Sequence, residues 1–354
     1  MTNLKTKDKK VIALTWWWTW GHIFPLLSIY NSLKEDDKYE FFWAWQEEWL
    51  EYDIALENDI DFLDIPSWKI RRYFDLRNFY EPLKNLTWIF FWIYFILRYK
   101  IDIVFSKWWF VSLPLCIAAF LLRKKIYIHE SDIVQWLANK IIWKIATKVF
   151  YSFPNAETLD KPEKNICSWQ ILNKDLLENI KDFELSENWR LNVLVTWWSQ
   201  WSTIIFDSLL KILPDIKDID FKIILGEKNL HFKDSFRKFP NVRTYDFINQ
   251  KDLWLVLKQT DIAITRWWAT SLWELNVFWI HSIIIPLEWS AWDHQYYNAM
   301  YFRQKYWSDL LDQNDDLTKN MYEKLNKYKT LRKAWLNLDD FYKATNIIKN
   351  ELNK

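Results

Sequence analysis

The segment VIALTWWWTWGH at residues 11–22 constrains the fold more than any other part of the chain. A short apolar run, typical of a buried strand, ends near Thr15, and a helical pattern begins at His22. Only a tight strand-to-helix turn fits between them. Glycine normally makes such a turn, because it adopts positive φ without steric cost and lets backbone amides approach a ligand closely. This chain instead carries four tryptophans there.

Tryptophan is abundant and glycine is scarce throughout the sequence. The chain contains 28 Trp and only 2 Gly, whereas glycine ordinarily makes up about 7% of a protein. Tryptophans also follow other predicted strands where glycine is expected, at Trp108, Trp109, Trp197, Trp198, Trp201, Trp267 and Trp268. We interpret most of them as glycines encoded by UGA and translated under a code that reads UGA as tryptophan. A truly Trp-rich protein is the alternative, and indole masses at Trp17 and Trp198 of the native protein would establish it.

Length, charge and cysteine content limit the class of protein. The 354 residues suffice for two domains, and the net charge of +1 argues against a nucleic-acid partner. Cys116 and Cys167 lack metal or disulfide spacing, as expected for reduced cysteines of a cytoplasmic protein. The longest unbroken apolar run, residues 88–97, is too short to span a membrane. We expect a soluble chain that can touch a membrane surface.

Short apolar runs alternate with amphipathic helical patterns, which predicts an α/β fold with two doubly wound parallel sheets. The predicted strands are residues 11–15, 40–44, 61–65, 101–105, 125–129, 148–151, 191–196, 221–226, 242–246, 261–265 and 282–286. The predicted helices lie near 22–34, 47–58, 78–98, 110–122, 134–146, 201–213, 250–258, 270–277 and 293–303, with two more in the tail. We expect a Rossmann-like N-terminal domain at 1–160, a linker at 161–190, a Rossmann-like C-terminal domain at 191–335, and a helix at 336–354 that packs back toward the first domain.

Reading Trp as Gly reveals two glycine-rich loops. Residues 15–22 become TGGGTGGH, and residues 194–202 become LVTGGSQGS, each directly after a strand. Such loops wrap backbone N–H groups around a phosphate or sugar. Ser199 can donate its hydroxyl to a phosphate oxygen, and Gln200 can point into the space between the domains. Two such loops predict a two-domain nucleotide-sugar transferase whose donor and acceptor meet between them.

With these motifs the chain resembles the MurG family of glycosyltransferases (family 28, GT-B fold), membrane-associated enzymes that complete the lipid-linked peptidoglycan precursor. The matching segments are TWWWTWGHIFP at 15–25, PSWKIRR at 66–72, FSKWWFVSLP at 105–114, IHESDIVQWLANK at 128–140, VTWWSQWS at 195–202, TRWWATSLWEL at 265–275 and DHQYYNA at 293–299. Nearly every mismatch with the family's glycines is a Trp. Trp43 and Trp273 match positions that are not firmly glycine, so we interpret these two as genuine.

The resemblance implies a donor site in the second domain. The backbone of four residues that begin a helix borders the UDP moiety: Ala269, Thr270, Ser271 and Leu272. Glu274 accepts hydrogen bonds from the ribose hydroxyls, although a first-turn carboxylate favoured by the helix dipole is the simpler alternative. Ile248 places its backbone against uracil. Gln295 and Asn298 bind hydroxyls of the N-acetylglucosamine group.

The resemblance implies an acceptor site in the first domain. His22 follows the first loop, and its imidazole can take a proton from an attacking hydroxyl, although a lone histidine at a helix start is more often structural. Glu130 is the competing catalytic carboxylate, with Asp132 close in sequence. Further substrate contacts fall on Thr19, Trp20, Gly21, Asp132 and Asn139.

The linker departs from the family pattern. The segment ICSWQILNK resembles a family segment that ends in an arginine facing the donor diphosphate, but Asn173 stands there, with Lys174 beside it. Either Lys174 or the Ser199 loop then compensates the phosphate charge, or the alignment slips by one residue.

Residues 68–98 suggest how the chain reaches a lipid-linked acceptor. Lys69, Arg71, Arg72 and Arg77 precede the aromatic segment IFFWIYFIL. Basic residues beside an apolar surface suit docking on anionic lipid. A buried helix with a solvated basic loop is the alternative interpretation.

The resemblance implies inverting transfer of GlcNAc from UDP-GlcNAc to undecaprenyl-pyrophosphoryl-MurNAc-pentapeptide at the cytoplasmic face of the cell membrane, where the enzyme is peripheral. The sequence contains no DxD-like pair, so we expect neither a tightly held metal nor another cofactor. A related GT-B transferase acting on another glycolipid is one alternative. A non-catalytic nucleotide-sugar-binding protein is another, and it follows if the tryptophans are real, because indoles would fill both loops.

Overall fold

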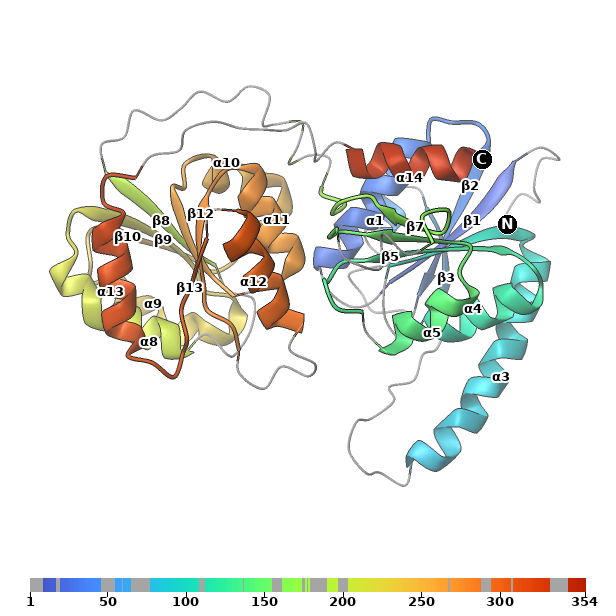
Figure 1. Cartoon of the computed structure of the whole chain (residues 1–354), viewed down its shortest axis with the longest axis horizontal. Coiled ribbons are helices and arrows are strands. Elements are labelled where there is room, and N and C mark those ends of the chain that lie inside the picture. Colours follow the sequence, from blue (N-terminus) through green and yellow to red (C-terminus); the bar gives the residue numbers. More distant parts are fainter. Residues whose placement is uncertain are drawn as a thin grey trace. The chain divides into compact units, whose positions relative to one another are not determined.

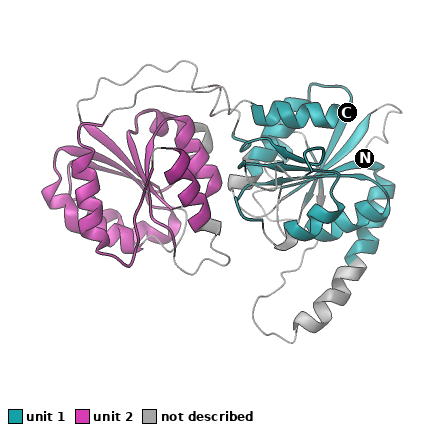
Figure 2. Cartoon of the chain, in the orientation of Figure 1, with its two compact units in different colours: residues 1–173, 340–354 teal, residues 174–339 magenta. Residues whose placement is uncertain are grey.

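The chain forms two compact units, coloured separately in Figure 2. Unit 1 comprises residues 1–173 and 340–354, and unit 2 comprises residues 174–339. The structure, a computed structural model, describes residues 9–16, 20–45, 55–58, 60–64, 77–107, 112–135, 137–154, 161–173, 176, 178, 190–196, 203–266, 268–287, 294–306, 308–331 and 343–354.

Unit 1 is built on a parallel sheet with the strand order β3-β2-β1-β4-β5-β6-β7 (Figure 1). The strands are β1 Lys10–Trp16, β2 Tyr39–Trp45, β3 Asp61–Asp64, β4 Ile101–Lys107, β5 Lys125–Glu130, β6 Lys148–Tyr151 and β7 Asn165–Cys167. The helices are α1 Trp20–Leu33, α3 Arg77–Arg98, α4 Ser112–Leu121, α5 Leu137–Ile145 and α14 Lys343–Asn353. Direction along the sheet reverses between β1 and β4, as in doubly wound nucleotide-binding folds.

Helices cover both faces of this sheet, so its strands are apolar almost throughout. Ile103 and Phe105 of β4 join the core under α1 and α14, whereas Val104 joins the core under α3, α4 and α5. This alternation follows from the two-residue period of a strand. It explains why a continuous apolar run, rather than a half-polar one, identified each strand.

The C-terminal helix α14 belongs to unit 1. Ile348 and Leu352 are fully buried in the core beneath α1. Tyr39 donates its hydroxyl hydrogen to Asn353 Oδ1 at 2.7 Å, and Lys349 Nζ donates to the carbonyl oxygen of Ser32 at 3.0 Å. The end of the chain is therefore fixed to the first unit by both apolar packing and hydrogen bonds.

Unit 2 repeats the same winding with the strand order β10-β9-β8-β11-β12-β13. Its strands are β8 Leu191–Thr196, β9 Ile219–Ile224, β10 Val242–Tyr245, β11 Ile262–Thr265, β12 His281–Ile284 and β13 Ser308–Leu310. The helices are α8 Thr203–Ile212, α9 Lys233–Phe236, α10 Gln250–Lys258, α11 Ala269–Val277, α12 His294–Lys305 and α13 Leu317–Lys327, with 3₁₀ turns η2 Leu213–Asp215 and η3 Glu227–Phe232. Sheet direction reverses between β8 and β11.

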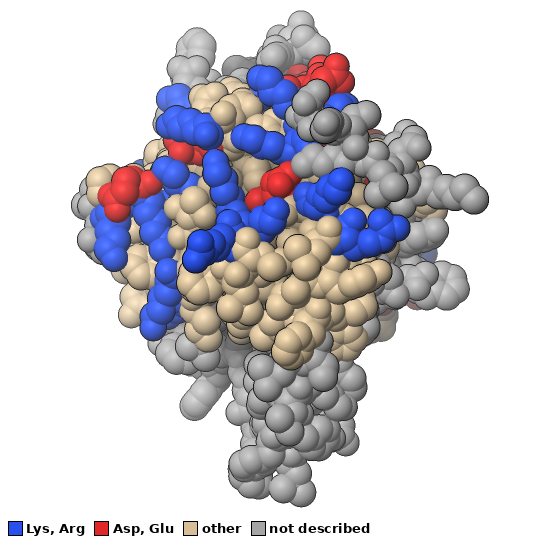
Figure 3. Space-filling view, turned by 90° about the vertical axis from the view of Figure 1, so that its right-hand side faces the viewer, with Lys and Arg blue, Asp and Glu red and all other residues tan. Residues whose placement is uncertain are grey.

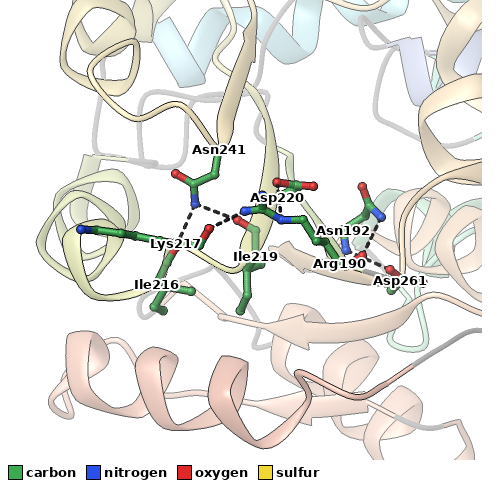
Figure 4. A network of polar contacts seen from close by, with 8 residues as sticks. All are labelled: Arg190, Asn192, Ile216, Lys217, Ile219, Asp220, Asn241 and Asp261. Carbon is green, nitrogen blue, oxygen red and sulfur yellow. Dashed lines mark hydrogen bonds and ion pairs between the residues drawn. The ribbon is translucent and has the colours of Figure 1, made fainter. Parts of the chain in front are cut away.

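The polar network in Figure 4 fixes the amino ends of the strands in unit 2. Arg190 Nε lies 3.1 Å from Asp220 Oδ1, and the backbone N–H of Asn192 donates to Asp261 Oδ2 at 2.9 Å. Asn241 Nδ2 donates to the carbonyl oxygens of Ile216 and Ile219 at 2.8 and 2.7 Å. The chain therefore enters β8 through bonds to β9 and β11, its two neighbours in the sheet.

Every strand predicted from the sequence is present. β7 and β13 were not predicted, because three-residue edge strands are too short to show a period. The helical segment 227–236 between β9 and β10 was also missed. Of the helix predicted at 47–58, only residues 55–58 lie in the described part of the chain, and 55–57 are helical.

The end of α11 has the geometry of a glycine-terminated helix. The backbone N–H of Trp279 donates to the Asn276 carbonyl at 3.0 Å, and that of Ile280 donates to the Leu275 carbonyl at 3.0 Å. This paired arrangement places Trp279 in the left-handed region, at φ 52°, where glycine is strongly preferred. Trp169 adopts a similar φ of 67°. Both values favour glycine at these positions.

Trp43 and Trp273 differ from Trp169 and Trp279. Both side chains are fully buried. Trp43 belongs to the core under α1, and the Trp273 ring packs edge-on against Phe302 with centroids 5.0 Å apart. These surroundings fit an indole, in keeping with the expectation that these two tryptophans are genuine.

Candidate functional site

Ligands of doubly wound folds bind at the carboxyl ends of the strands, beside the point where sheet direction reverses. In this chain that point follows β1 and β4 in unit 1, and β8 and β11 in unit 2. In sequence the predicted glycine loops follow β1 and β8, but residues 17–19 and 197–202 fall outside the described residues, so Thr19, Ser199 and Gln200 are not placed. Trp20, Gly21 and His22 form the first turn of α1. The side chains of Trp20 and His22, like that of Gln295 in α12, are also outside the described part.

Three predicted site residues of unit 1 meet at the end of β5. Glu130 is fully buried. Its Oε2 accepts a hydrogen bond from Asn139 Nδ2 at 2.7 Å, and its Oε1 accepts one from the backbone N–H of Asp132 at 3.1 Å. The carboxylate thus joins the strand end, the following turn and the first part of α5.

This arrangement determines what the Glu130 carboxylate can do. A buried carboxylate remains ionised only when hydrogen bonds replace its lost hydration, and donors occupy both oxygens here. Gln135 extends the polar cluster, since its Nε2 donates to the Tyr151 hydroxyl oxygen at 2.5 Å. The geometry suits an anchor for the turn at residues 131–135 better than a proton acceptor exposed to substrate.

In unit 2, α11 begins directly after β11. Trp268 precedes the helix with extended backbone angles, and its carbonyl accepts from the Leu272 N–H at 2.9 Å. Ala269 and Leu272 are buried, whereas Thr270 and Ser271 are half-buried. The unpaired N–H groups of a first helical turn, together with the helix dipole, attract an anion. The four residues predicted beside UDP therefore form one helix start at the carboxyl edge of the sheet.

Glu274 lies one turn further along α11 and is 9% exposed. A solvated surface carboxylate would be far more exposed, so this burial weighs against the simpler interpretation of Glu274. Ile248 lies in the loop that follows β10, and Asn298 is fully buried in α12. Asn173, also buried, is the last residue of unit 1 before the chain continues in unit 2, and Lys174 is outside the described residues.

Arg266 also lies at the carboxyl edge of unit 2, although the sequence motifs did not single it out. It follows β11, is 6% exposed, and uses one nitrogen, Nη1, to contact three oxygens. These are the Ile285 carbonyl at 3.3 Å, the Pro286 carbonyl at 3.2 Å and Gln313 Oε1 at 3.0 Å. Burial lowers the pKa of this guanidinium to about 10. In the sequence, the position of Arg266 inside the TRWWATSLWEL motif could have indicated a role for it.

Arg266 ties together three carboxyl-edge segments of unit 2. It joins the end of β11 to the stretch after β12, which leads toward α12, and to Gln313 after β13. α12 carries Gln295 and Asn298. The backbone at Ile285 and Pro286, after β12, is therefore held by a side chain that precedes α11.

Two features are absent from the part of the chain that the structure describes. Among the described residues, no three His, Cys, Asp or Glu side chains are grouped as a metal site requires. Within the described helices, none combines the length and apolar character needed to cross a membrane.

The fold defines the class of protein. The structure aligns with the crystal structure of MurG from Acinetobacter baumannii with a TM-score of 0.70 at 18% identity, over 95% of this chain and 93% of that one. A UDP-GlcNAc 2-epimerase from Neisseria meningitidis aligns equally well, with a TM-score of 0.70 at 12% identity over 97% and 99% of the two chains. At these identities the likeness shows the fold alone, which is GT-B, as expected.

The sequence identifies the family. Residues 12–151 match the glycosyltransferase family 28 N-terminal domain, and residues 192–340 match the family 28 C-terminal domain. Relatives named UDP-N-acetylglucosamine–N-acetylmuramyl-(pentapeptide) pyrophosphoryl-undecaprenol N-acetylglucosamine transferase include one from Clostridium botulinum, 33% identical over 96% of this chain and 97% of its own length. Another, from Borreliella afzelii, is 31% identical over 89% and 86%. The chain belongs to glycosyltransferase family 28 and is a glycosyltransferase.

Proposed function

We propose that this chain transfers GlcNAc from UDP-GlcNAc to the C4 hydroxyl of the muramoyl group in undecaprenyl-pyrophosphoryl-MurNAc-pentapeptide, the step from lipid I to lipid II in peptidoglycan synthesis. The observation that carries this proposal is end-to-end similarity, at 33% identity, to a relative named for that reaction. Both family domains are present in order.

The proposed chemistry is a single displacement with inversion at the anomeric carbon. The acceptor hydroxyl oxygen forms a bond to C1 of GlcNAc while the bond from C1 to the diphosphate oxygen breaks, so UDP leaves with that electron pair. The hydroxyl proton passes to a base on the enzyme. The first-turn N–H groups of α11 near Ala269, with the loop that bears Ser199, stabilise the charge that develops on UDP.

His22 is the proposed base. It belongs to the first turn of α1, which starts at the carboxyl edge of the sheet after β1. Glu130 is less suited, because it is fully buried and both of its oxygens already accept hydrogen bonds. We assign Glu130 and Asn139 to holding the β5–α5 turn, with Asp132 beside the acceptor.

The proposed donor site occupies the carboxyl edge of unit 2. The starting turn of α11 borders UDP, Glu274 binds the ribose hydroxyls, and the backbone of Ile248 meets uracil. Gln295 and Asn298 bind the sugar. Asn173 or Lys174 takes the place of the family's diphosphate-binding arginine.

We also propose that one side of unit 1 docks on an anionic membrane. Phe90, Tyr94 and Leu97 lie on a single face of α3 and are 71%, 60% and 59% exposed. α3 packs against α4, and α4 against α5; these two helices add further exposed apolar side chains, namely Phe120, Leu121 and Ile141. This set of six is the apolar patch.

Basic side chains border the apolar patch. Figure 3 looks at this side of unit 1 and shows Lys and Arg side chains gathered beside an uncharged area. Where side chains are described, the basic residues on or directly after the three helices include Arg98, Lys100, Arg123, Lys124, Lys140 and Lys144. An apolar surface with a cationic border suits insertion among acyl chains while the charges meet lipid phosphates. Arg71 and Arg72, also predicted to contribute, lie outside the described residues.

Vesicle co-sedimentation tests the docking. With vesicles containing anionic lipid, Phe90→Ser combined with Leu97→Ser should lower the bound fraction severalfold. Charge reversal at Arg71 and Arg72 should have a similar effect that weakens at high salt. Tyr322→Ser, at an exposed site on unit 2, is the control. Binding that is equal in all four proteins would remove these residues from membrane docking.

Measurement of UDP release decides among the proposed functions. The protein is made both as printed and from a gene with glycine at the UGA positions, and each is given UDP-GlcNAc with a lipid-linked MurNAc acceptor. Release only with this acceptor supports the proposal. If UDP is released only when another glycolipid serves as the acceptor, the chain is a related transferase. If both proteins bind UDP-GlcNAc but release no UDP, the chain is a non-catalytic nucleotide-sugar-binding protein.

A further inference from the structure

A second polar cluster lies on the opposite face of the strand ends that carry Glu130. Consecutive side chains of a strand point to opposite faces of the sheet. Glu130 and Tyr151 point toward α5, through Asn139 and the core on that side. His129 points the other way, in the row of Tyr127, toward the side covered by α1 and α14.

In this cluster Ser152 and His129 hold residues 169–170, which come later in the chain. Ser152 Oγ donates to Gln170 Oε1 at 2.5 Å, and both residues are fully buried. His129 Nε2 lies 3.2 Å from the carbonyl oxygen of Trp169. A carbonyl only accepts, so Nε2 carries the hydrogen and donates it. The Ser152 oxygen, 3.4 Å away, lies within reach of the same hydrogen.

The backbone strengthens this attachment. The carbonyl of Tyr151 accepts hydrogen bonds from the N–H groups of Ser168 and Trp169 at 3.0 and 3.1 Å, and the N–H of Ser152 donates to the carbonyl of Glu130 at 2.9 Å. The ends of β5 and β6 therefore hold the Glu130 cluster on one face and residues 168–170 on the other.

The attached segment is where the chain leaves unit 1. Residues 168–173 follow β7 and are the last of the first unit before the chain continues in unit 2 at Lys174. Buried amide and hydroxyl groups are stable only when their hydrogen bonds are made, so the polar contacts select one placement of this segment.

We propose that Gln170, Ser152 and His129 form a positioning unit that fixes the exit of the chain from unit 1 against the strand that carries Glu130. The proposal rests on the transfer reaction proposed above, because that reaction requires the donor held by unit 2 to reach the acceptor held by unit 1. The three side chains contact one another and the backbone at Trp169, and they act by holding residues 168–170 in place.

The test compares Ser152→Ala, Gln170→Met and their combination with the control Thr147→Val in the full-length chain. Thr147 Oγ1 accepts from the Ile126 N–H at 3.0 Å, so the control removes a hydrogen bond at the opposite end of the same two strands. Hydrogen exchange of the peptide covering 165–173 reports on the attachment. Values of kcat, the KM for each substrate, the dissociation constant of UDP-GlcNAc and the melting temperature report on the consequence.

Ser152→Ala and Gln170→Met should each speed exchange in that peptide and lower kcat about fivefold or more, because reacting groups tolerate little misplacement. The double variant should resemble the single ones, since both remove the same bond. Thr147→Val leaves residues 165–173 untouched and should lower only the melting temperature.

Unchanged exchange in the peptide, or a loss of kcat equal to that of Thr147→Val at matched melting temperature, would overturn the positioning role. Additive losses in the double variant would also refute it. An inactive parent protein would instead refute the transfer reaction, and the exchange comparison would still decide whether these residues hold the segment.

Discussion

Asn139 Nδ2 lies 2.7 Å from Glu130 Oε2 inside unit 1. This bond spans nine positions in sequence and joins the end of β5 to the start of α5. It places a carboxylate at the carboxyl edge of the sheet, where family 28 chemistry is expected, yet uses that carboxylate to hold backbone. A carboxylate that holds backbone and a carboxylate that accepts a proton should respond differently to substitution.

Glu130→Gln should keep kcat within about tenfold of the parent, whereas Glu130→Ala should lower it about 100-fold. The substituted amide still accepts from the Asp132 N–H, and it can donate to Asn139 Oδ1, which has no hydrogen-bond partner among the described residues. Asn139→Leu should resemble Glu130→Ala. Steady-state kinetics measured as a function of pH check this prediction. If Glu130→Gln were as inactive as Glu130→Ala, and the low-pH side of the kcat–pH profile changed, Glu130 would be the base.

Arg266→Met should raise the KM for UDP-GlcNAc about tenfold, because the backbone at Ile285 and Pro286 loses the donor that holds it. Arg266→Lys should recover little of this, since one ammonium cannot reproduce the planar fork of a guanidinium. Arg237→Met is the matched control, because Arg237 is an exposed residue of the same unit. An unchanged KM for the donor in Arg266→Met would contradict the assignment.

Glycine at Trp279 or Trp169 should leave stability unchanged or raise it by up to about 1 kcal/mol, because the left-handed conformation penalises any residue with a Cβ. Trp273→Gly should instead cost about 4 kcal/mol, since it empties a buried aromatic site. Urea unfolding of the three variants measures these differences. Equal losses at all three positions would argue that the tryptophans are native.

Asp309→Asn should lower stability by about 2 kcal/mol at neutral pH, with a smaller difference in acid. Burial opposes ionisation of Asp309, but hydrogen bonds from His281, Lys324 and Tyr328 outweigh it and hold its pKa well below the usual range. The stabilisation is therefore complete above the unfolded-state pKa near ~3.9 and disappears as pH falls through the lower folded-state value.

Urea unfolding of the parent and Asp309→Asn at pH 7 and pH 3 checks this pH dependence. Asp207→Asn, on an exposed face of α8, controls for the loss of a negative charge. A difference between parent and Asp309→Asn that stays constant with pH would contradict the proposed ionised cluster.

The strand predictions were correct because the apolar run that indicates a buried strand is a local feature of the sequence. An apolar run such as VIALT or LNVLV is buried on both faces of a parallel sheet wherever it pairs. β7 and β13 carry too few residues for such a signal. The sequence motifs likewise led to the family, since they match in order along the chain.

The tertiary structure decided which of the predicted residues work together. Glu130, Asp132 and Asn139 meet at the end of β5, and their hydrogen bonds limit the role that Glu130 can take. Arg266 and Gln170 were not assigned a role, because their partners are distant in sequence: Gln313 for the first and Ser152 for the second.

The sequence by itself therefore determined the two doubly wound sheets and the family, because hydrophobic period and motif order are written locally. Only the tertiary structure showed that α11 ends with Trp279 in the left-handed region and that Arg266 holds the backbone after β12. It also showed that Gln170, near the point where the chain leaves unit 1, is hydrogen-bonded to Ser152 at the end of β6. Each of these findings depends on which strands are neighbours in a sheet. Strand order is set by the packing of helices on both faces of the whole sheet, and local sequence does not determine it.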